Sequence, residues 1–395
     1  MSIRGKAYIM GAYEHPLRDA PDKSTPQLHA ECAKGALADA GLTKDDIDGY
    51  FCAGDAPGFG AMSMIDYMGL KNVRHMDSTE TGGSSYLLHV GHAAQAIAEG
   101  KCSVALVTLA GRPRQNKGGW GGGAGKPGQL TDGPPEAGYE NIYGGSTHNT
   151  YGMCAMRHMH EYGTTSEQLA WIKVAASHHA QYNEHAFLKD VVTVEQVVNS
   201  RMIADPLHLL DCCVVTDGGG ALIVVSPEVA KSLNRPKVKI MGAGESPKGP
   251  MGGHGLDLTH SGAVWSGPIA FGEAGVTPAD IKYASIYDSF TITVLMQLED
   301  LGFCKKGEGG KFVSDGNLIS GVGKLPFNTD GGGLCNNHPT NRGGITKVIE
   351  AVRQLRGEAH PKVQVPNCDI ALAHGTGGSL GTRHGAATLI MEREA

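Results

Sequence analysis

Residues 36–55, ALADAGLTKDDIDGYFCAGD, are repeated in outline by residues 270–289, AFGEAGVTPADIKYASIYDS. In both stretches an Ala-rich segment ends in Ala-Gly, an apolar residue and a threonine follow, and Asp-Ile precedes an apolar segment. This order predicts a helix, a glycine that ends it, and then a strand. Because the two stretches lie 234 residues apart, we expect two copies of one α/β unit in the chain.

A second pair of segments occurs in the same order and supports the duplication. CSVALVTLAG from Cys102 and CDIALAHGTGG from Cys368 each predict a buried strand that ends in glycine. We place the two halves at residues 1–230 and 231–395, with a loop insertion at about 112–160 in the first. The pattern predicts helices near residues 27–40, 84–99, 166–183, 264–274, 289–301 and 343–356, and strands near 4–11, 103–109, 221–226, 236–243, 284–287 and 369–374. Strands that alternate with helices imply sheets covered on both faces.

The composition excludes several classes of protein. With 395 residues, 41% of them hydrophobic, the chain is long enough to build a large globular core. The net charge of −6 and the lack of Lys/Arg blocks argue against nucleic acid as a partner. No apolar run is long enough for membrane insertion and the start MSIRGKAYIMGAY lacks a signal peptide, so we expect a soluble, cytoplasmic protein. The nine cysteines form no CxxC pair and the histidines favour surface or packing roles, so no metal site is expected.

The stretch from Arg112 to Gly145 interrupts the alternation of strands and helices. It is rich in Gly and Pro and too long for a plain connection, which indicates a lid, a binding loop or a partner surface. Within it, GWGGGAGKPG is similar to a phosphate-binding loop. Trp120 replaces the first required glycine and Pro127 the magnesium-binding Ser or Thr, so we reject that reading.

Three polar sites lie at strand ends or strand-to-helix turns. Tyr287 and Asp288 end one apolar strand, His338 lies between glycine turns ahead of a helix, and His374 ends another strand. Any one of them could be an ordinary turn residue. Together they favour a ligand site, because open α/β sheets collect ligands at the carboxyl ends of their strands.

Four motifs carry a resemblance to a known family. NTDGGGLCNNHPTNRGG (residues 328–344) and HGTGG (residues 374–378) resemble the Gly-His-Pro and Cys-x-Gly-Gly segments of thiolases. YGTTSEQLAWIKV and DPLHLLDCCVVTDGGGALIVVS are similar to the sterol carrier protein X-type branch. The resemblance implies the thiolase fold, an α/β protein with two duplicated βαβαβαββ halves in a five-layer α-β-α-β-α sandwich. It also implies a homodimer.

The sequence departs from that family at the nucleophile. Thiolases enter the helix predicted near residues 84–99 with a reactive cysteine, and Gly83 stands in that slot here, with Ser84 next to it. Glycine cannot form an acyl-enzyme, which argues against the usual acyl transfer. Thiolases have an Asn or His in a short motif that ends in Phe, and in this sequence the motif reads Tyr-Asp-Ser-Phe, with Tyr287 at the polar position. A tyrosine near a thioester can transfer protons. In this the sequence resembles the thiolase-fold retro-aldolases, which lack the cysteine and use tyrosine.

The resemblance therefore implies an enzyme that acts on an acyl-CoA thioester, with coenzyme A as part of the substrate and no bound cofactor. The expected reaction is retro-aldol cleavage of a β-hydroxyacyl-CoA. Tyr287, His338 and His374 are the implied catalytic residues, and His338 is expected to hold the enolate oxygen together with backbone amides near Gly83 and Ser84, the implied oxyanion region. Asn337, Gly375 and Gly377 are expected to bind substrate. A small zinc-ribbon plus OB-fold acyl-CoA-binding protein is the implied partner. The alternatives are a thiolase or acyltransferase on β-ketoacyl-CoA, which could use Ser84, and a non-catalytic acyl-CoA-binding subunit.

Overall fold

The computed structural model describes residues 2–115, 146–248, 257–339 and 342–394, and one nine-stranded sheet runs through them. Its strands pair in the order β3 (His75–Asp77), β2 (Gly49–Phe51), β4 (Val104–Gly111), β7 (Gly218–Val225), β1 (Tyr8–Glu14), β8 (Lys237–Lys248), β11 (His384–Glu394), β10 (Ile370–Gly378) and β9 (Tyr283–Ile286). Strands β1 and β8 pair at two positions, Tyr8 with Lys239 and Ile9 with Val238. The sheet is therefore two half-sheets joined by this short seam.

The second half-sheet repeats the strand order of the first. In place of a counterpart to β3 it has a single parallel bridge between Ala284, in β9, and Phe327. The duplicated βαβαβαββ halves implied a five-stranded sheet in each half. The structure differs in the seam that joins them and in the fifth strand of the second half, which is reduced to this bridge.

The two quoted repeats adopt the same structure. Helix α1 (Thr25–Ala40) ends at Gly41 with φ 72°, and α8 (Ala263–Ala274) ends at Gly275 with φ 69°. Both angles lie in the left-handed region that glycine adopts without strain. In each repeat the next threonine donates its backbone N–H at 2.8 Å to the aspartate three residues later, which starts the turn before the strand.

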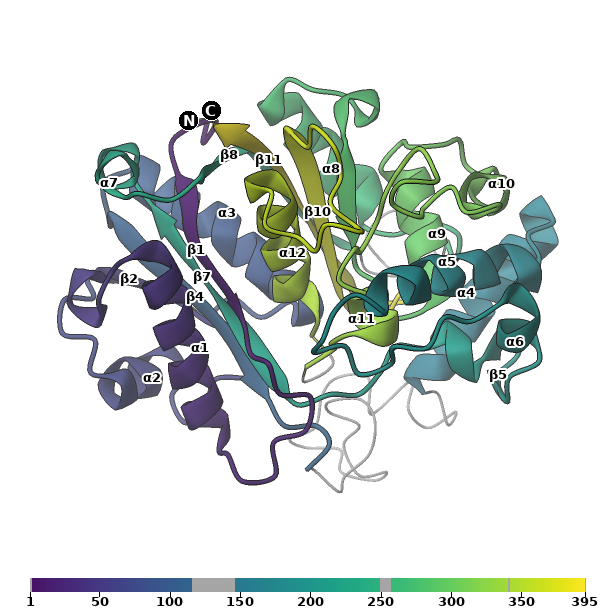
Figure 1. Cartoon of the computed structure of the whole chain (residues 1–395), viewed down its shortest axis with the longest axis horizontal. Coiled ribbons are helices and arrows are strands. Elements are labelled where there is room, and N and C mark those ends of the chain that lie inside the picture. Colours follow the sequence, from purple (N-terminus) through teal and green to yellow (C-terminus); the bar gives the residue numbers. More distant parts are fainter. Residues whose placement is uncertain (1, 116–145, 249–256, 340–341, 395) are drawn as a thin grey trace.

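The helices and half-sheets form five layers, the sandwich that the resemblance implies (Figure 1). Helix α1 covers the outer face of the first half-sheet and α8 that of the second. Helices α3 (Ser85–Ala98) and α12 (Gly344–Arg356) lie between the half-sheets. Residues along each strand alternate between the layers: Leu106 in β4 packs in the α1 cluster and Val107 in the central one. The central layer is thus the place where both halves contribute to one site.

Most of the remaining helices pack in the two outer layers. The remaining helices are α2 (Ala61–Met68), α4 (Thr147–Tyr162), α5 (Ser166–Ala180), α6 (Val194–Val198), α7 (Pro227–Ser232), α9 (Thr291–Asp300), α10 (Gly309–Val313) and α11 (Gly332–Cys335), and β5 (Met202–Ala204) pairs with β6 (Leu207–His208). The end of the predicted loop insertion is helix α4, and residues 116–145 of that loop lie outside the described residues. Within the described residues, no helix has the length and apolar character that crossing a bilayer requires.

His92 connects the two half-sheets through two ion pairs. This α3 side chain contacts Asp77 of β3 at 2.6 Å through Nδ1 and Glu245 of β8 at 3.1 Å through Nε2. The hydrogen bonds to Asp77 and Glu245 raise the pKa of His92 to about 9. Because the folded protein binds this proton more tightly than the unfolded chain, the ion pairs stabilise the fold while His92 is charged in both states.

We predict a pH dependence of stability that belongs to His92. Its contribution is fully present below the ordinary histidine pKa of about 6.5 and is lost as the pH rises through about 9. Since both ends of the pairs reach solvent, we expect a loss of only about 1 kcal/mol. Urea unfolding between pH 6 and pH 10 measures it, as the difference between the wild-type chain and His92→Gln. A difference that stays constant or grows with pH would contradict this assignment.

Candidate active site

Tyr287 and His338 form a buried pair in the central layer. Tyr287 extends β9 by one residue, because its backbone N–H donates to the carbonyl oxygen of His374 in β10 at 3.0 Å. His338 lies in the turn that follows α11. The His338 Nε2 atom lies 2.8 Å from the Tyr287 hydroxyl, and the rings meet edge to face at 5.4 Å between centroids. Both side chains are almost entirely excluded from solvent.

Gly83 lies directly against the hydroxyl of Tyr287. A Cβ atom at this position would stand 2.5 Å from Tyr287 Oη, 2.5 Å from Tyr287 Cε2 and 2.5 Å from the carbonyl oxygen of Thr376. These separations are far below van der Waals contact, so no side chain fits at residue 83 while Tyr287 is in place. The phenol therefore occupies the space into which a nucleophile at residue 83 would project.

The surroundings of Tyr287 keep its hydroxyl protonated. Burial raises the pKa of Tyr287 well above its ordinary value, and the nearby Cys213 and Tyr151 raise it further. A buried phenol of this kind is a neutral proton donor at neutral pH. The phenol is hydrogen-bonded to His338 Nε2, an imidazole nitrogen that can accept a proton. The pair is thus arranged to transfer a proton through the tyrosine to the imidazole or back.

Ser84 is held by local hydrogen bonds. Its hydroxyl contacts the carbonyl oxygen of Thr81 at 2.9 Å and the Thr81 hydroxyl at 3.0 Å. It is buried at the end of the short 3₁₀ turn Gly82–Ser84 that leads into α3. These contacts hold the hydroxyl against Thr81 and supply no histidine or carboxylate base, which argues against Ser84 as a nucleophile.

We predict that no acyl group is transferred to the protein. After incubation of the full chain with an acyl-CoA, intact-protein mass spectrometry should detect only the unmodified mass, because residue 83 has no side chain and Ser84 is not activated. Ser84→Ala serves as the matched variant and should retain turnover. An adduct mapped to Ser84 or to any cysteine would revive acyl transfer.

The structure does not bring the His374 side chain to this pair. Side chains alternate along a strand, and the neighbouring Gly375 faces Leu87 of α3, so His374 faces away from the central layer. Its Nδ1 atom lies 2.8 Å from Thr388 Oγ1, which in turn contacts Ser266 of α8 at 2.9 Å. Burial lowers the pKa of His374 to about 3. The sequence predicted that His374 ends a strand, but β10 continues to Gly378, and the His374 side chain points to the outer layer.

Asn337, Gly375 and Gly377 contact protein rather than open space. The Asn337 side chain donates to Glu14 Oε1 at 2.8 Å and accepts from Thr216 Oγ1 at 2.7 Å. A Cβ at Gly375 would collide with Leu87, and one at Gly377 with the carbonyl oxygen of Thr81. The two glycines let β10 approach the start of α3 closely, so their geometry favours packing roles over substrate contact.

Asp288 holds the glycine turn ahead of His338 and does not contact a histidine. Its Oδ1 atom accepts from the backbone N–H of Gly333 at 2.8 Å and from Lys347 Nζ at 2.8 Å. Three residues around the site were not predicted from the sequence: Lys347, Glu14 and Thr216. A lysine inside the amphipathic helix α12 was a detectable signal, whereas nothing in the sequence around Thr216 marks it. Among the described residues, no three His, Cys, Asp or Glu side chains are grouped so as to hold a metal ion.

The chain is similar to known proteins over most of its length. A family model described as "Thiolase C-terminal domain-like" matches residues 244–393. The chain is 36% identical over 372 residues to a "Steroid side-chain-cleaving aldolase" of Thermomonospora curvata, covering 90% of this chain and 91% of that protein. It is 32% identical to an "Acetyl-CoA acetyltransferase" of Methanothermobacter thermautotrophicus, covering 98% and 99%. A solved structure, "Ltp2-ChsH2(DUF35) aldolase", superposes with a TM-score of 0.87 at 33% identity, covering 99% of this chain and 98% of that one.

Proposed function

Because the chain belongs to the thiolase superfamily, we propose that it is an enzyme that cleaves a carbon–carbon bond of a β-hydroxyacyl-CoA by a retro-aldol reaction. The observation that carries this proposal is the Tyr287–His338 pair at 2.8 Å, with the phenol in the space beside Gly83. The similarity to a side-chain-cleaving aldolase over 90% of the chain supports the same reaction type.

The pair can carry the proton that the reaction must move. Tyr287 takes the proton of the substrate's β-hydroxyl group while it passes its own proton to His338 Nε2. The β-oxygen becomes a carbonyl oxygen, and the bond between the α- and β-carbons breaks. Its electron pair moves onto the thioester as an enolate. The proton returned from His338 through Tyr287 converts that enolate to the shortened acyl-CoA.

The enolate oxygen needs donors that are in place before the bond breaks. We propose that the backbone amides near Gly83 and Ser84, at the start of α3, serve this purpose. His338, which the resemblance implies as an oxyanion ligand, is assigned here to proton transfer because its Nε2 atom is bonded to the phenol. His374 is left out of the reaction because its side chain faces the outer layer.

The alternative of acyl transfer has support from the similarity to an acetyltransferase. It requires an acyl-enzyme, and neither Gly83 nor the bonded Ser84 offers a nucleophile for one. A non-catalytic subunit would have no use for a buried Tyr–His pair, which is costly to desolvate. The geometry therefore favours the aldolase.

We also propose that the enzyme works as a homodimer together with a small acyl-CoA-binding partner of the zinc-ribbon and OB-fold type. The support for a partner is the similarity to the solved Ltp2-ChsH2(DUF35) aldolase, whose name includes a DUF35 component, and the homodimer is what the family resemblance implies. Sedimentation of the full chain alone and with such a partner tests both parts.

A matched pair of substrates tests the reaction. The full chain is incubated with a β-hydroxyacyl-CoA and, separately, with the β-ketoacyl-CoA of the same carbon skeleton plus free CoA. We expect the first to yield a free ketone or aldehyde and a shortened acyl-CoA, and the second to remain unchanged. If only the β-ketoacyl-CoA is cleaved, the enzyme is a thiolase and the proposed aldolase reaction is wrong.

A further inference from the structure

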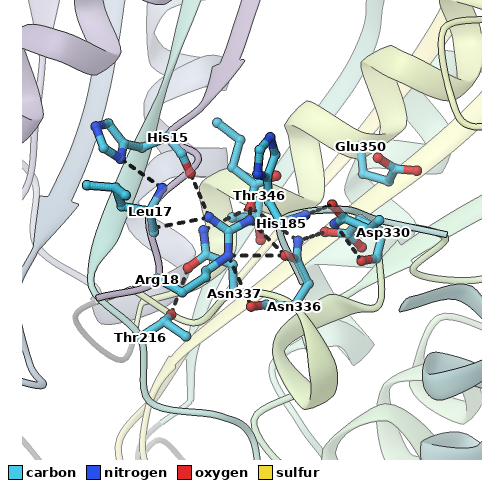
Figure 2. Close-up of polar contacts among 12 residues, drawn as sticks. His15, Leu17, Arg18, His185, Thr216, Asp330, Asn336, Asn337, Thr346 and Glu350 are labelled. Atoms are coloured by element: carbon cyan, nitrogen blue, oxygen red, sulfur yellow. Dashed lines mark hydrogen bonds and ion pairs between the residues drawn. The ribbon is translucent and has the colours of Figure 1, made fainter. Parts of the chain in front are cut away.

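A buried chain of hydrogen bonds leads from the first half of the protein to His338. Glu14, at the end of β1, accepts from Asn337 Nδ2 at 2.8 Å. Asn337 Oδ1 accepts from Thr216 Oγ1 at 2.7 Å, and Thr216 Oγ1 accepts from the backbone N–H of His338 at 2.8 Å. Figure 2 shows Thr216 and Asn337 beside Arg18, within a larger polar cluster. The chain of contacts ends at the pair that His338 forms with Tyr287.

The ionised Glu14 fixes which group donates and which accepts in every hydrogen bond of this series. The guanidinium groups of Arg18 and Arg353 outweigh the effect of burial and lower the pKa of Glu14 to about 2. Its carboxylate is therefore an acceptor only, and Asn337 must turn its NH₂ group towards it. The amide oxygen of Asn337 then faces Thr216, whose hydroxyl must donate to it. This leaves the Thr216 oxygen free to accept from the His338 N–H.

The neighbouring Asn336 anchors the same turn. Its Oδ1 atom accepts from Arg18 Nη2 at 2.7 Å, and its Nδ2 atom donates to Asp330 at 2.9 Å. Arg18 is fixed in turn by the carbonyl oxygen of His15 at 2.6 Å and by Glu14 at 2.9 Å. Since these side chains are buried and bonded at both ends, the turn that carries His338 has one well-defined position.

We propose that Glu14, Asn337 and Thr216 are positioning residues that hold the His338 imidazole in register with the Tyr287 hydroxyl. This series of hydrogen bonds ends on the backbone N–H of His338. It therefore fixes the position of the imidazole ring and leaves the charge of the ring unchanged. Glu14 and Thr216 belong to the first half, and His338 and Tyr287 to the second. The first half thereby aligns a proton-transfer pair that lies entirely in the second. This inference rests on the proposed function, because it assigns the three residues to that reaction.

Thr216→Val tests the proposal, because it keeps the shape of the side chain and removes the hydroxyl. We expect kcat on a β-hydroxyacyl-CoA to fall about 10- to 100-fold, as expected for a displaced catalytic group, with KM nearly unchanged. Thr216→Ser restores the hydroxyl and should recover most of kcat. The matched control is Thr108→Val, which removes an equally buried hydroxyl that contacts His29 at 2.9 Å and Tyr50 at 2.8 Å in the first half. It should keep kcat near the wild-type value.

A second readout does not depend on turnover. The ring ¹H–¹³C NMR signal of His338 in the full chain is assigned by its loss in His338→Gln. We expect this signal to shift in Thr216→Val, to return in Thr216→Ser and to stay in place in Thr108→Val. An unshifted signal with unchanged kcat in Thr216→Val overturns the proposal, as does an equal loss of kcat in Thr108→Val. If the wild-type chain cleaves no β-hydroxyacyl-CoA but the signal shifts as expected, the positioning role stands and the proposed function falls.

Discussion

Tyr287→Phe is expected to lower turnover of a β-hydroxyacyl-CoA by at least about 100-fold, since positioned acid–base groups are worth roughly 10²- to 10⁴-fold. The change removes only the hydroxyl that lies 2.8 Å from His338 Nε2 and leaves the ring that fills the space beside Gly83. Binding of the thioester should change little, so the loss should fall on kcat rather than KM. Steady-state kinetics with release of the carbonyl product as the readout measures it.

Tyr50→Phe is the matched control for this variant. Tyr50, in β2 of the first half-sheet, is fully buried and its hydroxyl contacts Thr108 at 2.8 Å. The Tyr50→Phe variant removes a buried phenolic hydroxyl of the same kind, and its turnover should stay close to the wild-type value. Near-normal turnover in Tyr287→Phe would mean that the tyrosine only fills space, and the proton transfer described above would be wrong.

Gly83→Ala is expected to abolish most of the activity by displacing the same phenol. The added methyl group would lie 2.5 Å from Tyr287 Oη and 2.5 Å from the backbone oxygen of Thr376. The ring can move only by breaking its contact with His338, and the β10 backbone cannot move freely. Because a displacement of about 1 Å can cost about 100-fold in rate, we expect a loss of that size or more. The thermal midpoint should fall as well, since overpacking a buried site is destabilising.

Gly272→Ala provides the matched glycine control. A Cβ atom at this position, in α8, would meet no atom within 4 Å. Since alanine is the better helix former, this variant should keep both turnover and the thermal midpoint. If Gly83→Ala is as active as Gly272→Ala, the space beside Tyr287 is larger than the structure indicates, and the reason for the missing nucleophile is lost.

The fold could be predicted from the sequence where local chemistry repeats. Ala40-Gly41 and Ala274-Gly275 end helices because glycine takes the left-handed conformation there, and the two predicted helices match α1 and α8 within two residues at either end. Strand β11 was missed. Its central residues are buried on both faces, so they show no alternation of polar and apolar side chains to recognise.

The site was predictable only in part, for two physical reasons. The face to which His374 points depends on how β10 packs against Leu87 of α3, and a strand-end motif contains no information on that packing. Thr216 and Glu14 reach His338 from positions 122 and more than 300 residues away in the chain. Their role comes from tertiary contacts across the central layer, which single-sequence patterns do not encode. Tyr287 and His338 could be proposed from the sequence because each has a local pattern around it, an apolar strand before Tyr287 and glycine turns on both sides of His338.

A single-turnover experiment distinguishes cleavage without a covalent intermediate from cleavage through an acyl-enzyme. The full chain, in molar excess over a β-hydroxyacyl-CoA and with no free CoA present, is quenched over time and both products are quantified. We expect the carbonyl compound and the shortened acyl-CoA to appear together and in equal amounts. Release of one product while the other stays on the protein, or no cleavage until free CoA is added, would contradict this expectation.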